Sequence, residues 1–255
     1  AVSPKALAVL QREKSNENIQ RQPMRCTCAC HKTKNTTLNS HEIGRAISSD
    51  DRQFSQWFET KAGINTSTGS SKQWGIVYEE QAAQSYEAQT GETCLRVGYV
   101  GHPTISWMGG EPDRITTSGK LVEIKTSIRL DTPNVPLSVD HHAQVQIMME
   151  ILDLDMCDLV RYQPARKNFG FPEVIHIIPV PRDKQWFGSH FPLLESVHIK
   201  LTTYHQTGEM PAEVAQHLQD TRRRRVSDSH GGGGLASASV PWLIPEPRHR
   251  RTRMK

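Results

Sequence analysis

Three charged residues lie close together in a part of the chain that is otherwise apolar. Asp113 follows a proline in GGEPD, and Glu123 and Lys125 interrupt the apolar segment LVEIK. Side chains two residues apart on a β-strand point to the same face, so Glu123 and Lys125 share a face if LVEIK is a strand. If the segment that closes with Asp113 pairs with this strand, the three charges converge. Charges inside a sheet are costly unless they are paired or bind a metal.

These groups suit a divalent metal and the hydrolysis of a phosphodiester. The carboxylates of Asp113 and Glu123 and the backbone carbonyl of Ile124 are hard oxygen ligands, which Mg²⁺ and Mn²⁺ prefer. Lys125 could orient an attacking water or offset charge on a scissile phosphate. The alternative is an ordinary polar hairpin, because Glu-x-Lys alone is a common pattern.

Helices and strands alternate around these residues. The expected elements are a short helix with Ser40 as its N-cap, a helix over 74–91 ended by Gly91, a strand, a turn and a second strand over 95–113, a strand over 119–127, a helix over 137–154, strands over 156–163 and 173–181, and a helix over 183–204 interrupted near Pro192. The strand over 173–181 is apolar for long enough to be central in the sheet. The order predicts an α/β fold, with a central mixed β-sheet flanked by helices.

Composition divides the chain into three parts. Residues 1–37 are polar and irregular, one domain spans 38–218, and a basic tail over 219–255, with RRRR and GGGG, is predicted to be disordered. From Arg222 onward, nine Lys and Arg face two acidic residues, so residues 222–255 carry +7 and the rest of the chain −3. The arginine-rich segments suggest a nuclear targeting signal or nucleic-acid binding.

Five cysteines, an odd number, make a poor disulfide framework, so we expect an intracellular, reducing compartment. The arginine-rich segments favour the nucleus. Three of them lie in CTCACH, which is either the end of a zinc module or, as we favour, an unliganded segment. No apolar run is long enough to cross a membrane. The chain begins at Ala1 without a secretory leader, and we interpret it as a fragment or a processed product.

Two more motifs complete an ordered series. Glu79 follows Gly75 by four residues in WGIVYE, and HHAQVQ places His141 and Gln144 on one helix face. A solvated glutamate and a surface polar pair are the ordinary interpretations of each motif alone. The order WGxxxE, EPD, LVEIK and HHAQVQ resembles the PD-(D/E)xK nuclease superfamily, and within it the lambda exonuclease or YqaJ-type viral recombinase group. The resemblance covers about residues 38–203 and implies a restriction-endonuclease-like core.

The resemblance also implies a role for each matched residue. Asp113, Glu123 and the Ile124 carbonyl would ligate the metal, and Glu79 would support the metal site directly or through water. Lys125 would act on the nucleophilic water.

Four further positions are carried over, and two of them depart from the group. Gln144 would position the substrate or the water, and Ser40 falls where the group has a serine that helps to bind a DNA 5′-phosphate. His141 stands where the group has a tyrosine, and Arg114 stands where it commonly has a glycine. We assign Ser40, Arg114 and His141 to contact with DNA, with an exposed Arg114 as the alternative.

The function implied is a Mg²⁺-dependent DNA nuclease, in which Mn²⁺ can substitute. It would be an exonuclease on double-stranded ends that leaves 5′-phosphate and 3′-hydroxyl products and serves recombination, repair or the replication of a virus or mobile element. DNA is the expected partner and no membrane is expected, while a homo-oligomer and a recombination partner protein stay open. The alternatives are a structure-specific endonuclease with the same core and a catalytically silent DNA-binding scaffold.

Overall fold

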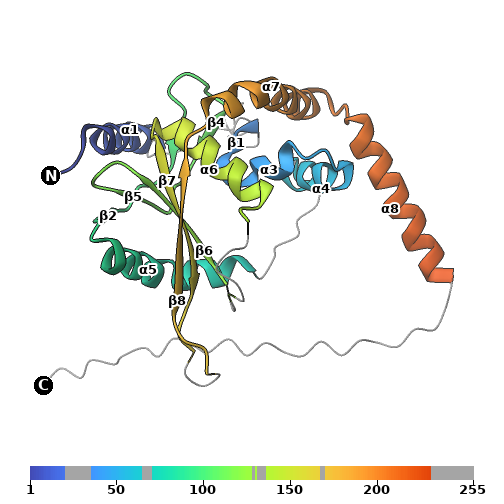
Figure 1. The fold of residues 1–255 in the computed structure, drawn as a ribbon. Coiled ribbons are helices and arrows are strands. Elements are labelled where there is room, and N and C mark those ends of the chain that lie inside the picture. Colours follow the sequence, from blue (N-terminus) through green and yellow to red (C-terminus); the bar gives the residue numbers. More distant parts are fainter. Residues whose placement is uncertain (21–35, 65–70, 128–129, 131–135, 167–169, 231–255) are drawn as a thin grey trace, which may run out of the picture. The chain divides into compact units, whose positions relative to one another are not determined.

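A computed structural model describes residues 1–20, 36–64, 71–127, 130, 136–166 and 170–230 (Figure 1). The chain divides into two units, Ala1–His217 and Leu218–Lys255. The helices are α1 (Pro4–Gln20), the 3₁₀ turn η1 (Ser40–Glu42), α3 (Ile43–Ala46), α4 (Asp51–Lys61), α5 (Ser71–Thr90), α6 (Val139–Leu152), α7 (Lys184–Thr207) and α8 (Ala212–His230). The strands are β1 (Leu38–Asn39), β2 (Cys94–Leu95), β3 (Val100–Gly101), β4 (Met108–Gly110), β5 (Arg114–Thr116), β6 (Leu121–Thr126), β7 (Met156–Gln163) and β8 (Val174–Pro181).

The strands of the first unit form two sheets. The larger has the order β2-β5-β6-β7-β8, with β6 and β7 parallel and the other pairs antiparallel. The smaller has the order β1-β4-β3, with β1 parallel to β4. Helices α5 and α6 lie on opposite sides of the larger sheet (Figure 1). The predicted α/β fold, with a mixed sheet flanked by helices, is confirmed.

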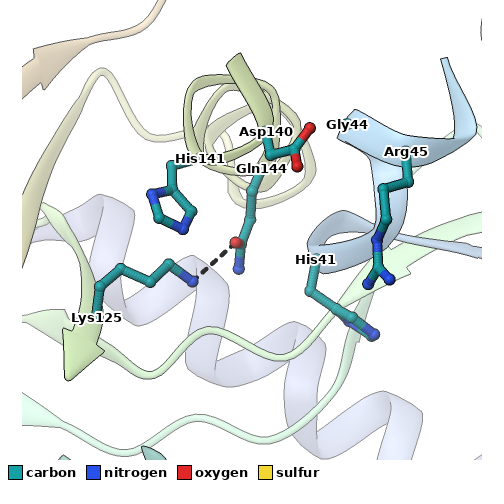
Figure 2. Close-up of a pocket in the computed structure, with 7 residues that line it drawn as sticks. All are labelled: His41, Gly44, Arg45, Lys125, Asp140, His141 and Gln144. Carbon is teal, nitrogen blue, oxygen red and sulfur yellow. Dashed lines mark hydrogen bonds between the residues drawn. The ribbon is translucent and has the colours of Figure 1, made fainter. Parts of the chain in front are cut away.

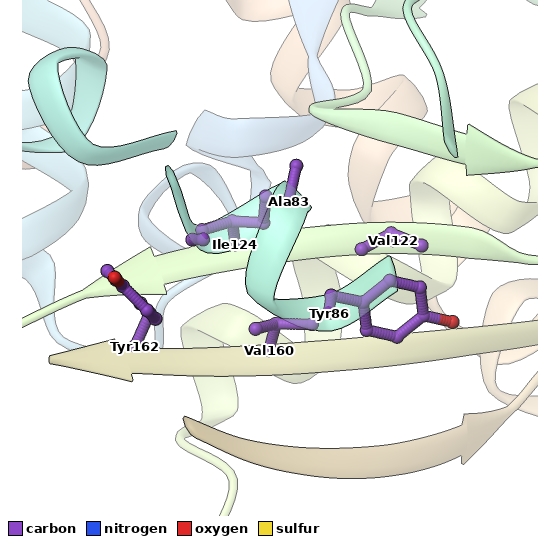
Figure 3. Close-up of a cluster of buried hydrophobic side chains, with 7 residues drawn as sticks. Ala83, Tyr86, Val122, Ile124, Val160 and Tyr162 are labelled. Atoms are coloured by element: carbon purple, nitrogen blue, oxygen red, sulfur yellow. The ribbon is translucent and has the colours of Figure 1, made fainter. Parts of the chain in front are cut away.

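The apolar core between α5 and the larger sheet determines which way β6 faces. The core cluster consists of Ala82, Ala83, Tyr86, Val122, Ile124, Val160 and Tyr162 (Figure 3). Within it, the Tyr86 hydroxyl donates a 2.6 Å hydrogen bond to Oδ2 of buried Asp158. Because side chains alternate along a strand, burial of Val122 and Ile124 against α5 turns Glu123 and Lys125 to the α6 side.

Several predicted boundaries agree with the structure to within a few residues. Strand β7 spans 156–163 as predicted, and Gly91, with φ of 72°, follows the last residue of α5. A left-handed glycine is the common end of a helix, because it has no Cβ to clash. Ser138 caps α6 by accepting a hydrogen bond from the backbone N–H of His141.

Strand β8 is at the edge of the larger sheet, so the prediction that it is central is wrong. The middle position belongs to β6, and β7 is also an internal strand, with Leu159 and Val160 fully buried. Pro179 and Pro181 in β8 carry no N–H donor, and such residues are confined to edge strands or strand ends. Apolar character alone did not distinguish the two strands.

Helix α7 continues through Pro192, so the predicted interruption is also wrong. A proline inside a helix removes one backbone hydrogen bond and crowds the preceding turn. The turns that follow Pro192 bury Leu194, Val197 and Leu201. The burial of those side chains offsets the lost bond.

Both ends of the chain contain more helix than expected. Helix α1 occupies part of the segment 1–37 expected to be irregular, and it buries Ala6 and Val9. Helix α8 continues to His230, beyond the expected start of disorder near 219. Arginine has a high helix propensity, so RRRR extends this helix rather than ending it. The CTCACH cluster and residues 231–255 lie outside the described residues.

None of the helices among the described residues is long and apolar enough to cross a membrane.

Gly44 allows α3 to approach α6 closely, and we expect Gly44→Ala to be costly. A Cβ on Gly44 would lie 2.6 Å from the Cα of Asp140, so one backbone must move. The expected loss is about 1–3 kcal/mol in the free energy of unfolding, measured by urea denaturation. Gly188→Ala is the control, because a Cβ there meets nothing within 4 Å, and it should be neutral or stabilising. Equal stability of wild type and Gly44→Ala would contradict this close packing.

Candidate active site

The β5–β6 register brings Asp113 opposite Glu123. Arg114 pairs with Val122 and Ile115 with Leu121, and extending this antiparallel register by one residue places Asp113 across from Glu123. Asp113 therefore precedes β5 and does not close a strand, which corrects the predicted placement. Its Oδ2 accepts a 2.6 Å hydrogen bond from the backbone N–H of Ile124. This bond holds the Asp113 carboxylate beside the strand that carries Glu123.

Glu123, Lys125 and Gln144 form a closed set of hydrogen bonds on the α6 side of the sheet. Lys125 Nζ donates to Glu123 Oε1 at 2.7 Å and to Gln144 Oε1 at 2.9 Å. The amide nitrogen of Gln144 donates to the same Glu123 Oε1 at 2.6 Å. Strand β6 supplies the first two side chains and α6 the third, so the predicted residues from both motifs meet.

The second oxygen of Glu123 stands apart from this network. Glu123 is 2% exposed, and its Oε2 has no hydrogen-bond partner among the described residues. A buried carboxylate oxygen without a partner is costly unless a cation or another donor completes it.

Asp113 shows the same excess of negative charge. Burial, first of all, and then repulsion by Glu123 raise the pKa of Asp113 well above its usual range, although the Ile124 N–H and Lys125 oppose the rise. A divalent cation between the two carboxylates would remove this conflict.

The oxygen donors therefore fit Mg²⁺ or Mn²⁺, with few protein ligands. The described residues contain no group of three or more His, Cys, Asp or Glu side chains placed to hold one ion. Mg²⁺ commonly takes only one or two carboxylates from the protein and fills its other positions with water and phosphate oxygens. Two carboxylates and a backbone carbonyl match that pattern.

A polar cavity of about 440 Å³ opens beside Lys125 and Gln144 (Figure 2). Its lining residues are His41, Gly44, Arg45, Lys125, Asp140, His141 and Gln144. In Figure 2, Lys125 and His141 lie on one side of the cavity, and His41 and Arg45 lie across from them on η1 and α3. Lysine and arginine on opposite walls make this cavity suited to a phosphate group.

His41 and Arg45 were not predicted from the sequence as site residues. They are four residues apart in SHEIGRAI, a spacing that places side chains on one helix face, and this was the available signal. Ser40, which precedes His41 and was predicted to contact DNA, is 1% exposed. It packs against Gly110 instead of lining the cavity. The N-cap of η1 is Asn39, one residue before the predicted cap.

His141 lies in the cavity wall, as its predicted contact with DNA requires. Burial, and then the positive charges of Lys125 and Arg161, lower its pKa, so the imidazole is neutral at neutral pH. Its Nδ1 has no hydrogen-bond partner in the part of the chain that the structure describes. This nitrogen is itself buried, so it is not open to the cavity.

Glu79 and Arg114 lie together, on the α5 side of the sheet. Arg114 is 4% exposed, and its guanidinium pairs with Glu79 and, at 2.9 Å, with Glu80. Arg114 is thus neither exposed nor directed at solvent, and this position does not favour the predicted DNA contact.

The second glutamine of HHAQVQ has a structural position. Gln146 donates a 2.9 Å hydrogen bond to the Pro181 carbonyl and accepts one of 2.7 Å from the Asp183 N–H. Asp183 in turn caps α7 by accepting from the Trp186 N–H. Gln146 therefore joins α6 to the β8–α7 connection, while Gln144 faces the candidate site.

Comparison with solved structures identifies the fold. The alkaline exonuclease LHK-Exo from Laribacter hongkongensis has a TM-score of 0.56 and 17% identity, covering 78% of this chain and 97% of that chain. The crystal structure of LHK-Exo with dAMP has a TM-score of 0.56 and 17% identity, covering 77% of this chain and 97% of that chain. A phage-related exonuclease from Haemophilus somnus 129PT has a TM-score of 0.53 and 16% identity, covering 67% of this chain and 94% of that chain. This likeness confirms the restriction-endonuclease-like fold predicted from the motifs.

The sequence itself matches a family model. No match is found among curated proteins. Residues 21–151, slightly more than half of the chain, match the model of the YqaJ-like viral recombinase domain. The matched range includes Glu79, Asp113, Glu123, Lys125 and Gln144, the residues on which the resemblance was first based. The chain belongs to the YqaJ-like viral recombinase domain family.

Proposed function

We propose that this protein is a Mg²⁺-dependent DNA exonuclease that hydrolyses phosphodiester bonds at double-stranded ends. The observation that carries the proposal is the pair of carboxylates, Asp113 and Glu123, held beside Lys125 and Gln144 with one Glu123 oxygen left without a partner among the described residues. The fold shared with LHK-Exo and the phage-related exonuclease supports it. Recombination, repair, or the replication of a virus or mobile element is the proposed role.

Each residue of the site has a defined task in this proposal. Asp113, Glu123 and the Ile124 carbonyl would hold Mg²⁺ or Mn²⁺. A divalent cation bound there would lower the pKa of a water and neutralise charge on the scissile phosphate. Lys125 holds its ammonium group next to the Glu123 carboxylate, where it can orient the attacking water and offset charge on the phosphate.

Gln144 completes the positioning of Lys125. Its amide oxygen accepts from Lys125 and its amide nitrogen donates to Glu123, so it fixes the ammonium group relative to the carboxylate. Such positioning matters, because misplacement of a catalytic group by about 1 Å can cost about 10²-fold in rate. The cavity beyond Gln144, with Arg45 and His41, would take a phosphate of the DNA strand.

The test uses linear duplex DNA of which one 5′ end at a time carries a label, with and without a 5′-phosphate, together with closed circular DNA. Loss of label from the ends of linear DNA, in Mg²⁺ and not in EDTA, is the expected result. The dependence on a 5′-phosphate shows whether the cavity recognises the strand end.

Two outcomes would change the assignment. Internal cuts, or cleavage of closed circles, would indicate an endonuclease with the same core. Normal DNA binding with no cleavage in either Mg²⁺ or Mn²⁺ would indicate a catalytically silent scaffold.

A further inference from the structure

Arg114 stands at a position next to the candidate metal site, yet it faces away from the α6 side. Cross-strand partners share a face of the sheet, and Arg114 is the partner of Val122, which is buried against α5. Glu123 follows Val122 and faces the opposite side. The guanidinium of Arg114 is therefore directed at α5, where Glu79 and Glu80 lie.

The contacts of Arg114 occupy most of its donors. One terminal nitrogen donates to Glu79 Oε1 and to the backbone carbonyl of Asp113, and the other donates to Glu80 Oε2 at 2.9 Å. Arg96 also pairs with Glu80, so this pair of glutamates has two positive partners. With a side chain only 5% exposed, Arg114 is held in place by ion pairs that solvent screens weakly.

We infer that Arg114 is a positioning residue that holds Glu79 away from the metal, so that the metal site uses Asp113 and Glu123 as its only carboxylate ligands. This inference rests on the proposed metal-dependent nuclease. It decides between the two roles that the motif left open for Glu79, and it excludes direct ligation.

The charge balance gives this arrangement a measurable consequence. Three carboxylates, Asp113, Glu123 and Glu79, would make a site of high negative charge and high cation affinity. Arg114 neutralises one of them and keeps its carboxylate on the α5 side. Cation affinity in oxygen-ligand sites follows the number of charged ligands. Replacement of Arg114, which releases Glu79, should therefore strengthen cation binding. Replacement of Glu79 in the otherwise native protein should change the cation affinity little.

The experiment titrates Mn²⁺ into the full-length protein by calorimetry, without DNA, for wild type, Arg114→Gln, Glu79→Gln and the double variant. We expect Glu79→Gln to change the Kd for Mn²⁺ by less than about twofold and Arg114→Gln to tighten binding about tenfold. The double variant should return to the wild-type value. Arg114→Lys, which keeps a positive partner for Glu79, should remain within about threefold of wild type.

Arg182→Gln is the matched control. Arg182 is similarly buried and pairs with Glu150 and Asp153 at the C-terminal end of α6. It should lower the melting temperature as Arg114→Gln does and leave the Kd for Mn²⁺ unchanged. A melting curve of each variant establishes that it is folded, and Glu79→Gln decides the question if Arg114→Gln does not fold.

The outcomes separate this inference from the proposed function. If Glu123→Gln abolishes Mn²⁺ binding and Glu79→Gln weakens it tenfold or more, Glu79 is a direct ligand and only the inference is overturned. If Arg114→Gln is folded and binds Mn²⁺ as wild type does, the inference is overturned as well. If Mn²⁺ binds equally well to Glu123→Gln, the proposed metal site is refuted and the inference with it.

Discussion

Glu123→Gln is expected to lower the rate of Mg²⁺-dependent cleavage by about 10³-fold or more. The change keeps the shape of the side chain and removes the charge that faces the proposed cation. It also weakens the hold on Lys125, whose ammonium group donates to Glu123 Oε1 at 2.7 Å. Lys125→Ala should lower the cleavage rate by about 10²–10³-fold. The cation would still bind, but the scissile phosphate and the attacking water would lose the ammonium group.

Single-turnover cleavage of end-labelled linear duplex, with the protein in excess, measures these rates without interference from product release. Lys120→Ala is the matched control, because Lys120 lies just before β6 and pairs with Asp158 and Glu92 at 3.3 and 3.4 Å. It should keep the cleavage rate within about twofold at temperatures where it is folded. Equal rates for wild type and Glu123→Gln would show that the chemistry lies elsewhere in the protein.

Asp113→Asn is expected to abolish cleavage and, in EDTA at neutral pH, to stabilise the protein. The folded-state pKa of Asp113 is raised, first by burial and then by Glu123, above the ordinary value of about 3.9 that applies in the unfolded chain. A group of this kind favours the folded state below about pH 3.9, and that contribution is lost as the pH rises through the raised pKa. Above the raised pKa, the ionised carboxylate is thus a net cost to the metal-free fold.

The asparagine removes that cost and retains the hydrogen bond. Its side-chain oxygen can still accept from the Ile124 N–H, which donates to Asp113 Oδ2 at 2.6 Å in the native protein. We therefore expect the free energy of unfolding to rise in the variant, because no charge is buried at this position. Chemical denaturation in EDTA across the range from pH 4 to neutral, with the gain growing as the pH rises, is the measurement.

Added Mg²⁺ should make wild type more stable than Asp113→Asn. A cation that binds only the folded protein raises its melting temperature, so wild type should gain stability with added Mg²⁺ while Asp113→Asn should not. Asp158→Asn is the control for a buried aspartate with good partners. Tyr86 and Lys120 both donate to it, so its replacement should destabilise by about 1–3 kcal/mol at every Mg²⁺ concentration. A less stable Asp113→Asn in EDTA would contradict the strain assigned to the two carboxylates.

A site that is unfavourable without the proposed cation would explain why charges occur in an otherwise apolar strand. The unpartnered Glu123 oxygen and the raised pKa of Asp113 both reflect negative charge held together by the fold. Functional sites commonly carry such local costs, which the rest of the structure offsets. Here the offset includes the α5 core on the opposite face of the same strand, where Val122 is fully buried.

The sequence by itself determined the features that depend on local periodicity. Alternation along LVEIK placed Glu123 and Lys125 on one face, and the helical spacing in HHAQVQ indicated that Gln144 lies on the face with His141. Glycine after α5 and serine before α6 set helix ends, because capping is decided by a few adjacent residues. These patterns were sufficient to predict the fold class and the family.

Only the tertiary structure decided the features that depend on partners distant in sequence. The edge position of β8, the cavity wall formed by Arg45, and the pairing of Arg114 with Glu79 each require a register or a packing contact between separate elements. The local sequence pattern around a charged residue in a strand is the same whether that residue faces solvent, DNA or a buried carboxylate. Which of these it meets is set by cross-strand register and by the helix that covers that face, and neither is encoded in a local pattern.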